Sequence, residues 1–158
     1  MSGVFVGVDE SKEAAAALRW AVRYAETAHM PISVITVLDP LTFTALWTDR
    51  PADSVPEAYV DATRGAIADL IARLESDQGR DISVPVDIRV EIGHPVRTLV
   101  AAAAEADLLV VGACGTSAVA SLLLGSVSAG VSRHAHCSVA IIRARPVQHG
   151  GAPDLDPR

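Results

Sequence analysis

Short apolar runs alternate with amphipathic helical repeats along the chain, and this alternation restricts the fold more than any other feature. Apolar runs typical of buried parallel strands occupy residues 4–9, 32–38, 84–90, 107–111 and 138–142. Between them, apolar side chains recur at three- and four-residue spacing, as at Leu18, Ala21 and Val22, which predicts four helices. Ser11 is the expected N-cap of the first helix, and Pro31 stops its continuation. Strands that alternate with helices in this way predict an α/β fold, a three-layer doubly wound parallel sheet of five strands.

The composition fits one domain with a core of small and branched side chains. Half of the 158 residues are apolar but only 4% are aromatic, so Val, Ile, Leu and Ala must fill the core. We expect one domain over residues 1–145 and a flexible tail over 146–158, where glycines and prolines interrupt any pattern. The connection over residues 39–56 is long for such a domain, and we interpret it as a binding segment or as disorder.

Charge and hydropathy argue against two classes of partner. The net charge of −6 leaves no basic stripe that could displace counterions from a nucleic acid, so we expect no nucleic-acid partner. No run of about 18 apolar residues indicates a membrane span. The chain enters its first apolar run without a basic leader or cleavage-site pattern, so we expect a cytoplasmic protein. The two cysteines, Cys114 and Cys137, form no CxxC pair and are interpreted as unpaired.

A glycine-punctuated segment lies between the fourth apolar run and the last helical repeat. Gly112 and Gly115 are followed after nine residues by Gly125, Ser126, Val127 and Ser128. A glycine loop between a strand and a helix lets backbone amides approach a phosphate, and the hydroxyls of Ser126 and Ser128 can donate to phosphate oxygens. Two plainer interpretations stay open, in which Gly125 and Ser126 form only a helix cap and the other glycines only a turn.

Asp9, at the end of the first apolar run, is the other candidate binding residue. In doubly wound sheets, ligands bind beyond the carboxyl ends of strands where the strand order reverses. If the first and fourth strands are neighbours, Asp9 and the glycine segment face one cleft. The alternative for Asp9 is an Asx turn that serves the backbone alone.

The spacing Gly-x2-Gly-x9-Gly-Ser resembles the ATP-binding branch of the universal stress protein family. The resemblance extends over residues 3–143 and includes the segments 8–11, 36–39, 90–95, 122–127 and 137–142. It implies a strand order of 3-2-1-4-5 and a site for an adenine nucleotide. ATP is the leading ligand, with AMP or cyclic AMP as alternatives, and Mg²⁺ can accompany ATP. The implied binding residues are Asp9 at the adenosine, Val37 whose backbone reads the base, and Gly112, Gly115, Gly125, Ser126, Val127 and Ser128.

One position departs from that family pattern. Where the family commonly carries Arg or His, this chain has Cys114, and residues 116–124 contain no charged side chain. The loss of a charge-assisted hydrogen bond predicts a weaker ATP site or a preference for a less charged adenine ligand. Mg²⁺, Arg97 or Arg133 could offset the missing charge.

These patterns favour a regulatory nucleotide-binding protein, because the motif offers no base or nucleophile beside a transferable phosphate. Two alternatives stay open: an α/β enzyme that slowly hydrolyses ATP or cleaves a nucleotide, and a nucleotide-free dimeric interaction protein. The last strand is an expected sheet edge whose run from Val139 to Ile142 carries no charge. An apolar edge of this kind invites pairing with a second copy, so we predict a homodimer, as the resemblance also implies.

Overall fold

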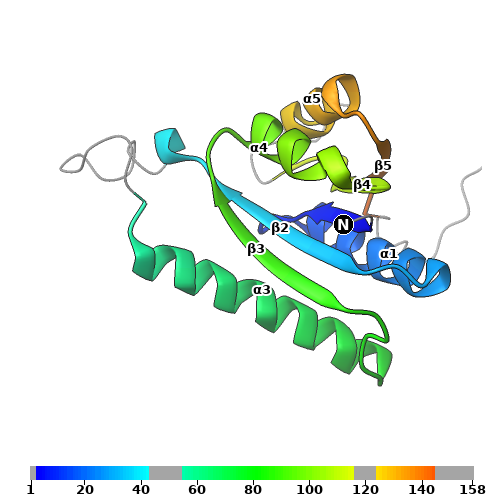
Figure 1. The fold of residues 1–158 in the computed structure, drawn as a ribbon. Helices are drawn as coiled ribbons and strands as arrows, with labels where there is room; N and C mark the ends of the chain where they lie inside the picture. Colours follow the sequence, from blue (N-terminus) through cyan, green and yellow to red (C-terminus); the bar gives the residue numbers. More distant parts are fainter. Residues whose placement is uncertain (1–2, 43–54, 116–123, 145–158) are drawn as a thin grey trace, which may run out of the picture.

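A five-stranded parallel sheet forms the centre of the protein, as seen in a computed structural model that describes residues 3–42, 55–115 and 124–144 (Figure 1). The strand order is β3-β2-β1-β4-β5, and every neighbouring pair is parallel. The predicted fold class and strand order are therefore confirmed. The strands are β1 (Val4–Gly7), β2 (Ile32–Leu38), β3 (Val86–Ile92), β4 (Leu108–Gly112) and β5 (Ser138–Ile142).

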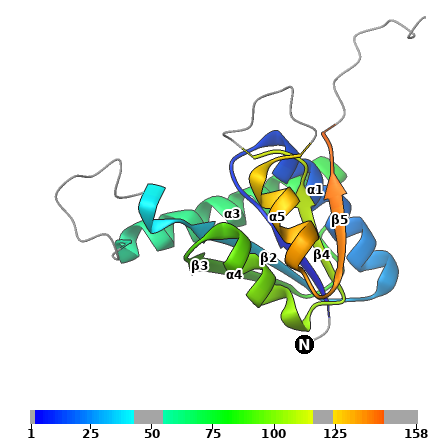
Figure 2. The same cartoon turned by 90° about the horizontal axis from the view of Figure 1, so that it is seen from above.

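Helices cover both faces of the sheet, which makes three layers (Figures 1 and 2). One face carries α1 (Lys12–Ala28) and α3 (Glu57–Gln78), and the other carries α4 (Pro95–Ala102) and α5 (Ser126–His134). A 3-10 turn, η1 (Ala103–Glu105), extends α4. The four predicted helices are all present. The long connection begins with helical residues 40–42, and its remainder and the predicted tail fall outside the described residues, apart from 55–56.

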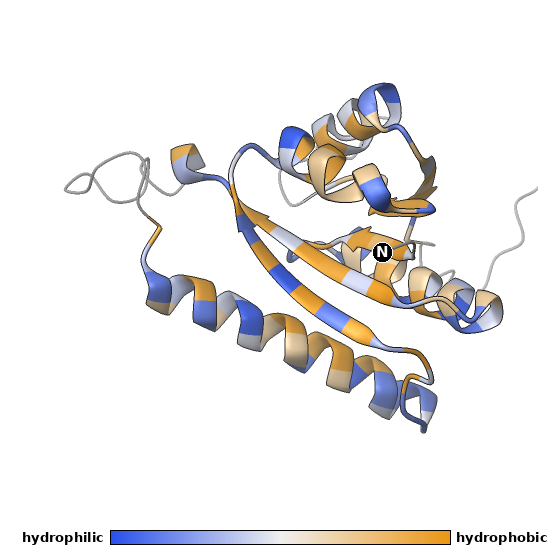
Figure 3. Cartoon of the chain, viewed as in Figure 1, coloured by the Kyte–Doolittle hydropathy of each residue, from blue (hydrophilic) through white to orange (hydrophobic). Residues whose placement is uncertain are grey.

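Side chains of the central strands alternate between the two faces, and both faces are apolar. In β1, Val4 and Val6 pack beneath α1 and α3, whereas Phe5 points to the face covered by α4 and α5. In β4, Val110 and Val111 divide in the same way. Figure 3 accordingly shows hydrophobic residues along these strands, with hydrophilic residues interspersed along α3. A strand buried on both faces needs a continuous apolar run, which is why these segments were recognisable.

The first helix begins and ends where its sequence indicates. The Ser11 hydroxyl oxygen accepts a hydrogen bond from the amide of Ala14 at 3.1 Å, which confirms it as the N-cap of α1. The helix buries a row of small side chains, including Ala17, Ala21 and Ala25, so its backbone can lie close to the sheet. None of the helices in the described ranges is long and apolar enough to cross a membrane.

Three strands have bounds that differ from the predicted ones. The fourth, Leu108–Gly112, is shifted by only one residue from 107–111. The first strand ends at Gly7, not at residue 9, because Asp9 turns the chain toward α1. The third strand spans Val86–Ile92 instead of 84–90. It begins only after Pro85, which has no amide hydrogen to donate. It ends at Ile92, and the next residue is Gly93, whose φ of 154° suits glycine and whose amide donates to the carbonyl of Leu38 at 3.0 Å.

Glu26, near the end of α1, fastens the segment that follows α3. Its carboxylate accepts two hydrogen bonds from the Arg80 guanidinium, at 2.6 and 2.7 Å, and two from the amide and hydroxyl of Ser83, at 3.0 and 3.1 Å. The Glu26 side chain is only 11% exposed. The hydrogen bond from Arg80, followed by that from the Ser83 backbone, lowers the pKa of Glu26 from 4.5 to about 2, although burial opposes the shift.

We expect Glu26→Gln to lower the free energy of unfolding by about 1–3 kcal/mol at pH 7, because the amide cannot replace a doubly paired carboxylate. The pKa of Glu26 is lower in the folded than in the unfolded chain. The stabilisation is therefore complete above about pH 4.5 and is lost as the pH falls through about 2. Urea denaturation at several pH values measures this, and the gap between variant and parent should close toward acid.

Asp77→Asn is the matched control, because Asp77 also pairs with an arginine, Arg19, at 3.5 Å. Both side chains of this pair are more than half exposed, and such pairs contribute about 0–1 kcal/mol to the free energy of unfolding. Equal losses in the two variants would contradict the role assigned to Glu26.

Candidate functional site

The carboxyl ends of β1 and β4 lie side by side at the centre of the sheet. Val4 pairs with Leu108 and Val6 pairs with Val110 in parallel register. After β1 the chain passes to α1 on one face, and after β4 it passes to α5 on the other, so the strand order reverses between them. This is the place where doubly wound sheets bind ligands.

The tip of β1 meets the first half of the glycine segment. An added Cβ at Gly115 would lie 2.9 Å from Oδ2 of Asp9, so the carboxylate and the bare backbone of Gly115 face each other. The other carboxylate oxygen of Asp9, Oδ1, accepts a hydrogen bond from the amide of Ser11 at 2.9 Å. Asp9 therefore makes an Asx turn and also faces the loop, and its side chain is exposed to a ligand.

The start of α1 is joined to the same loop. The Ser11 hydroxyl donates to the carbonyl of Cys114 at 3.5 Å. At Gly112, an added Cβ would lie 2.9 Å from the carbonyl carbon and Cβ of Glu13 and 3.1 Å from the amide of Ala14. Gly112 thus lacks a side chain because α1 occupies that space, whereas an added Cβ at Gly115 would meet only the Asp9 side chain.

The carbonyl of Ala113 connects the two halves of the glycine segment. It accepts a hydrogen bond from the amide of Gly125 at 2.7 Å and lies 2.8 Å from the hydroxyl of Ser128. That hydroxyl also lies 3.0 Å from the carbonyl of Gly125, and the Ser128 side chain is 1% exposed. The one hydroxyl proton of Ser128 is shared between these carbonyls. In this arrangement Ser128 holds the two halves together, and its side chain is buried.

Ser126 and Val127 form the first turn of α5, after Gly125 at the N-cap. No side chain caps this helix, and no acidic residue lies in its first turn. The first amides of a helix have no partner within it, and they carry partial positive charge. Ser126 is exposed, whereas Val127 packs partly into the core beneath α4 and α5. The outward-facing groups of this turn are therefore backbone amides and one hydroxyl.

Val37 lies one strand away, where β2 continues beyond the end of β1. The amide of Val8 donates to the carbonyl of Ile35 at 2.8 Å. Because backbone groups alternate along a strand, those of Val37 point to the same side, past Gly7, the last paired residue of β1. The hydroxyl of Thr36 donates to the carbonyl of Val8 at 3.0 Å, which holds this corner together. The side chain of Val37 packs into the core.

Sequence reasoning missed three groups that shape this edge of the sheet. The Ala113 carbonyl and the Thr36 hydroxyl were not singled out, and Ser11 was assigned only a capping role. Their partners are distant in the sequence, so no local pattern could have identified them. Among the described residues, no three His, Cys, Asp or Glu side chains are grouped to hold a metal ion.

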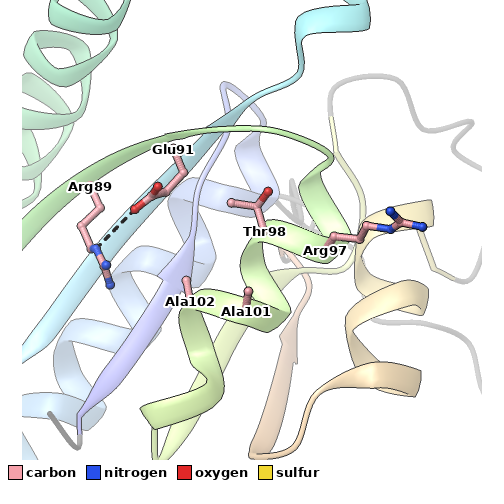
Figure 4. Close-up of a pocket in the computed structure, with 6 residues that line it drawn as sticks. All are labelled: Arg89, Glu91, Arg97, Thr98, Ala101 and Ala102. Atoms are coloured by element: carbon pink, nitrogen blue, oxygen red, sulfur yellow. Dashed lines mark ion pairs between the residues drawn. The ribbon is translucent and has the colours of Figure 1, made fainter. Parts of the chain in front are cut away.

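A separate shallow hollow of about 380 Å³ lies between β3 and α4. Figure 4 shows its lining residues, Arg89, Glu91, Arg97, Thr98, Ala101 and Ala102. Nε of Arg89 pairs with Oε1 of Glu91 at 3.6 Å, and Arg97 adds a further positive charge to the lining. It borders the outer strand of the sheet and does not include the glycine segment.

Comparison with known proteins identifies similar sequences over nearly the whole chain. The model of the universal stress protein family matches residues 2–143. Universal stress proteins Rv2623 and Rv2005c of Mycobacterium tuberculosis are 36% identical over 141 residues and 34% identical over 146 residues. These matches cover 89% and 90% of this chain but 47% and 48% of the relatives. The chain therefore spans about half the length of these curated relatives.

Solved structures of similar fold include two that hold adenine nucleotides. UspA from Lactobacillus plantarum superimposes with a TM-score of 0.71 at 24% identity, covering 90% of this chain and 97% of that one. A universal stress protein in complex with cAMP gives 0.60 at 28% identity, covering 90% and 96%. The Archaeoglobus fulgidus protein in complex with dAMP gives 0.63 at 19% identity, covering 90% and 98%. At 24% and 19% identity, the first and third show a shared fold alone.

The glycine contacts predict different costs for two single methyl groups. Gly112→Ala should lower the free energy of unfolding by about 1–3 kcal/mol, because the new Cβ meets the backbone of α1. Gly115→Ala should cost less than about 1 kcal/mol, because its Cβ meets only the end of the exposed Asp9 side chain. Urea denaturation of both variants measures the difference. A Gly115→Ala variant as unstable as Gly112→Ala would refute this division of roles.

Proposed function

This chain belongs to the universal stress protein family, and we propose that it binds an adenine nucleotide as a regulatory ligand. The proposal rests on one observation: the Asp9 carboxylate faces the backbone of Gly115 where the strand order reverses. The carboxylate of Asp9 can accept hydrogen bonds from the nucleoside, and the backbone of Gly115 can approach the phosphate. Both lie at the carboxyl ends of the central strands. The hydrogen bond from Gly125 to the carbonyl of Ala113 adds the start of α5 to the same edge.

The adenosine end of the proposed site consists of Asp9 and Val37. A carboxylate accepts hydrogen bonds from sugar hydroxyls or an exocyclic amine, and it repels phosphate. Asp9 therefore suits the nucleoside end of the ligand. The backbone groups of Val37, beyond the end of β1, suit recognition of the base edge, as the family resemblance implies.

The phosphate end consists of Gly115, Ser126 and Val127. The amides at the start of α5, which have no side-chain cap, and the exposed hydroxyl of Ser126 suit phosphate oxygens. Gly112, Gly125 and Ser128 act indirectly in this proposal, because they set the shape of the loop. When ATP is the ligand, Mg²⁺ can bridge its phosphates.

The relative solved with cAMP supports an adenine ligand, since it is 28% identical and shares the fold. Among adenine nucleotides we favour ATP, on the family spacing of the glycines, with AMP and cyclic AMP as the alternatives. We propose binding without rapid turnover, because the carboxylate at the site, Asp9, belongs to the adenosine end. We place this function in the cytoplasm, where adenine nucleotides are abundant and two cysteines that form no disulfide stay reduced.

Gly115→Asp should reduce binding of ATP and AMP at least tenfold, because its carboxylate would face both Asp9 and the phosphates. Mass spectrometry first identifies any nucleotide released from freshly purified protein. Isothermal titration then measures the affinities for ATP and AMP. Gly65→Asp is the matched control, with the same added charge on α3, where no atom lies within 4 Å of an added Cβ. Equal affinities in the two variants, or no adenine ligand bound by the parent protein, would refute the proposal.

We further propose that two copies pair through β5, which lies at the edge of the sheet and pairs with β4. The amide of Ala113 donates to the carbonyl of Ile142 at 2.7 Å. By alternation, the backbone groups of Val139 and Ile141 point outward, and the apolar strand between them offers no charge against pairing.

Light scattering at micromolar concentration should therefore give about twice the mass of one chain. Val139→Pro removes one outward amide and should shift the mass toward that of a monomer. Circular dichroism checks that the variant remains folded. A parent protein with the mass of a single chain would exclude this interface.

A further inference from the structure

A phosphate bound at the start of α5 would need a cation that the glycine segment does not supply. Residues 112–128 contain no lysine or arginine, and Cys114 lies where the family resemblance implies a basic residue, which leaves Arg97 and Arg133 as candidate cations. The structure separates these two arginines clearly.

Arg133 lies in the last turn of α5. With a rise of about 1.5 Å per residue, it is about 10 Å along the helix axis from Ser126. It therefore lies toward the amino ends of the strands, whereas Asp9 and Gly115 lie at their carboxyl ends.

Arg97 lies in the first turn of α4, next to α5. The two helices approach closely at Gly130, where an added Cβ would lie 2.6 Å from Cγ2 of Val96. Both helices start at the carboxyl ends of strands and run in the same direction. Gly130 is one turn beyond Ser126, so the first turn of α4 lies beside the first turns of α5.

The orientation of Arg97 follows from its neighbours in α4. Leu99 faces the sheet, where its methyl groups lie 3.2 Å from an added Cβ at Gly7, and Val96 faces α5. At about 100° per residue, Arg97 lies roughly 160° around the helix from Leu99, on the solvent side toward α5. Figure 4 shows its side chain extending toward α5 and away from the Arg89–Glu91 pair.

The charge of Arg97 is available to a ligand as far as the described residues show. Ion pairs engage Arg19, Arg80 and Arg89, whereas Arg97 forms none with another described residue. The first turns of α4 and α5 contain no acidic residue. Arg97 is exposed, so its guanidinium can turn toward an anion without loss of core packing.

We propose that Arg97 binds the phosphate groups of the nucleotide and supplies the positive charge that the glycine segment lacks. This inference rests on the proposed function, and it makes the site two-ended. Asp9 contacts the nucleoside beside α1, and Arg97 contacts the phosphates beside α5. A guanidinium can donate two parallel hydrogen bonds to phosphate oxygens. The preference for phosphorylated ligands over adenosine therefore depends on Arg97 in α4.

The experiment compares Arg97→Gln with Arg133→Gln, which removes the same charge at the far end of α5. Isothermal titration with adenosine, AMP and ATP is performed at two salt concentrations. Arg97→Gln should weaken ATP binding about tenfold to a hundredfold, leave adenosine binding unchanged, and reduce the salt dependence of ATP affinity. Arg133→Gln should match the parent protein for all three ligands. Arg97→Lys should restore part of the loss as a point charge.

Three results would overturn the inference, and they are distinguishable. Equal ATP affinities for Arg97→Gln and Arg133→Gln, with normal binding by the parent, would exclude Arg97 alone and leave the proposed function intact. Equal loss of adenosine and ATP in Arg97→Gln would show a structural role, which thermal unfolding would confirm. Failure of the parent to bind any of the three ligands would refute the proposed function, and the role of Arg97 with it.

Discussion

The carbonyl of Ala113 is the group on which the arrangement of the site depends. It accepts from the Gly125 amide and lies within hydrogen-bond distance of the Ser128 hydroxyl, so one acceptor joins the end of β4 to the start of α5. Each such bond contributes a net of about 0.5–1.5 kcal/mol, and an unsatisfied buried partner costs about 1–3 kcal/mol. The start of α5 is thereby positioned against the sheet itself. Both ends of the glycine segment keep a fixed place at the tip of β1.

Glycine serves different purposes at neighbouring points of this structure. Gly112 leaves room for the backbone of α1, Gly115 leaves the space in front of Asp9 open, and Gly130 lets α4 approach α5. The chemical property is the same in each case, the absence of Cβ. Its effect depends on what lies opposite, which is helix backbone in one case, a carboxylate in the second and a valine in the third. A spacing pattern alone cannot separate these roles.

The sequence was sufficient to predict the layers and the neighbours of the site. Buried strands on both sheet faces are continuous apolar runs, and the end of α1 and the cap at Ser11 have local signals. The start of the third strand was misplaced because Pro85 breaks an otherwise regular run. The Glu26 network also escaped prediction, since Arg80 lies 54 residues away in the chain.

The sequence indicated the residues of the candidate site better than the hydrogen bonds that join them. Asp9 and Gly115 were expected to share a cleft, and they face each other. Ser128 was expected to donate to phosphate, whereas its hydroxyl is buried against the carbonyls of Ala113 and Gly125. The direction of a serine hydroxyl depends on how a loop folds back on itself. That direction has no signature in residue type or spacing.

The unequal lengths of β1 and β2 have an evolutionary consequence. Because β2 runs beyond Gly7, the groups that Val37 presents at the edge belong to the main chain, while its side chain faces inward. Exchange of this valine for another branched residue would alter packing and leave the donor and acceptor in place. Under the proposed function, homologues could thus diverge at this position without changing the backbone groups offered to the base, and an alignment column would carry no trace of those groups.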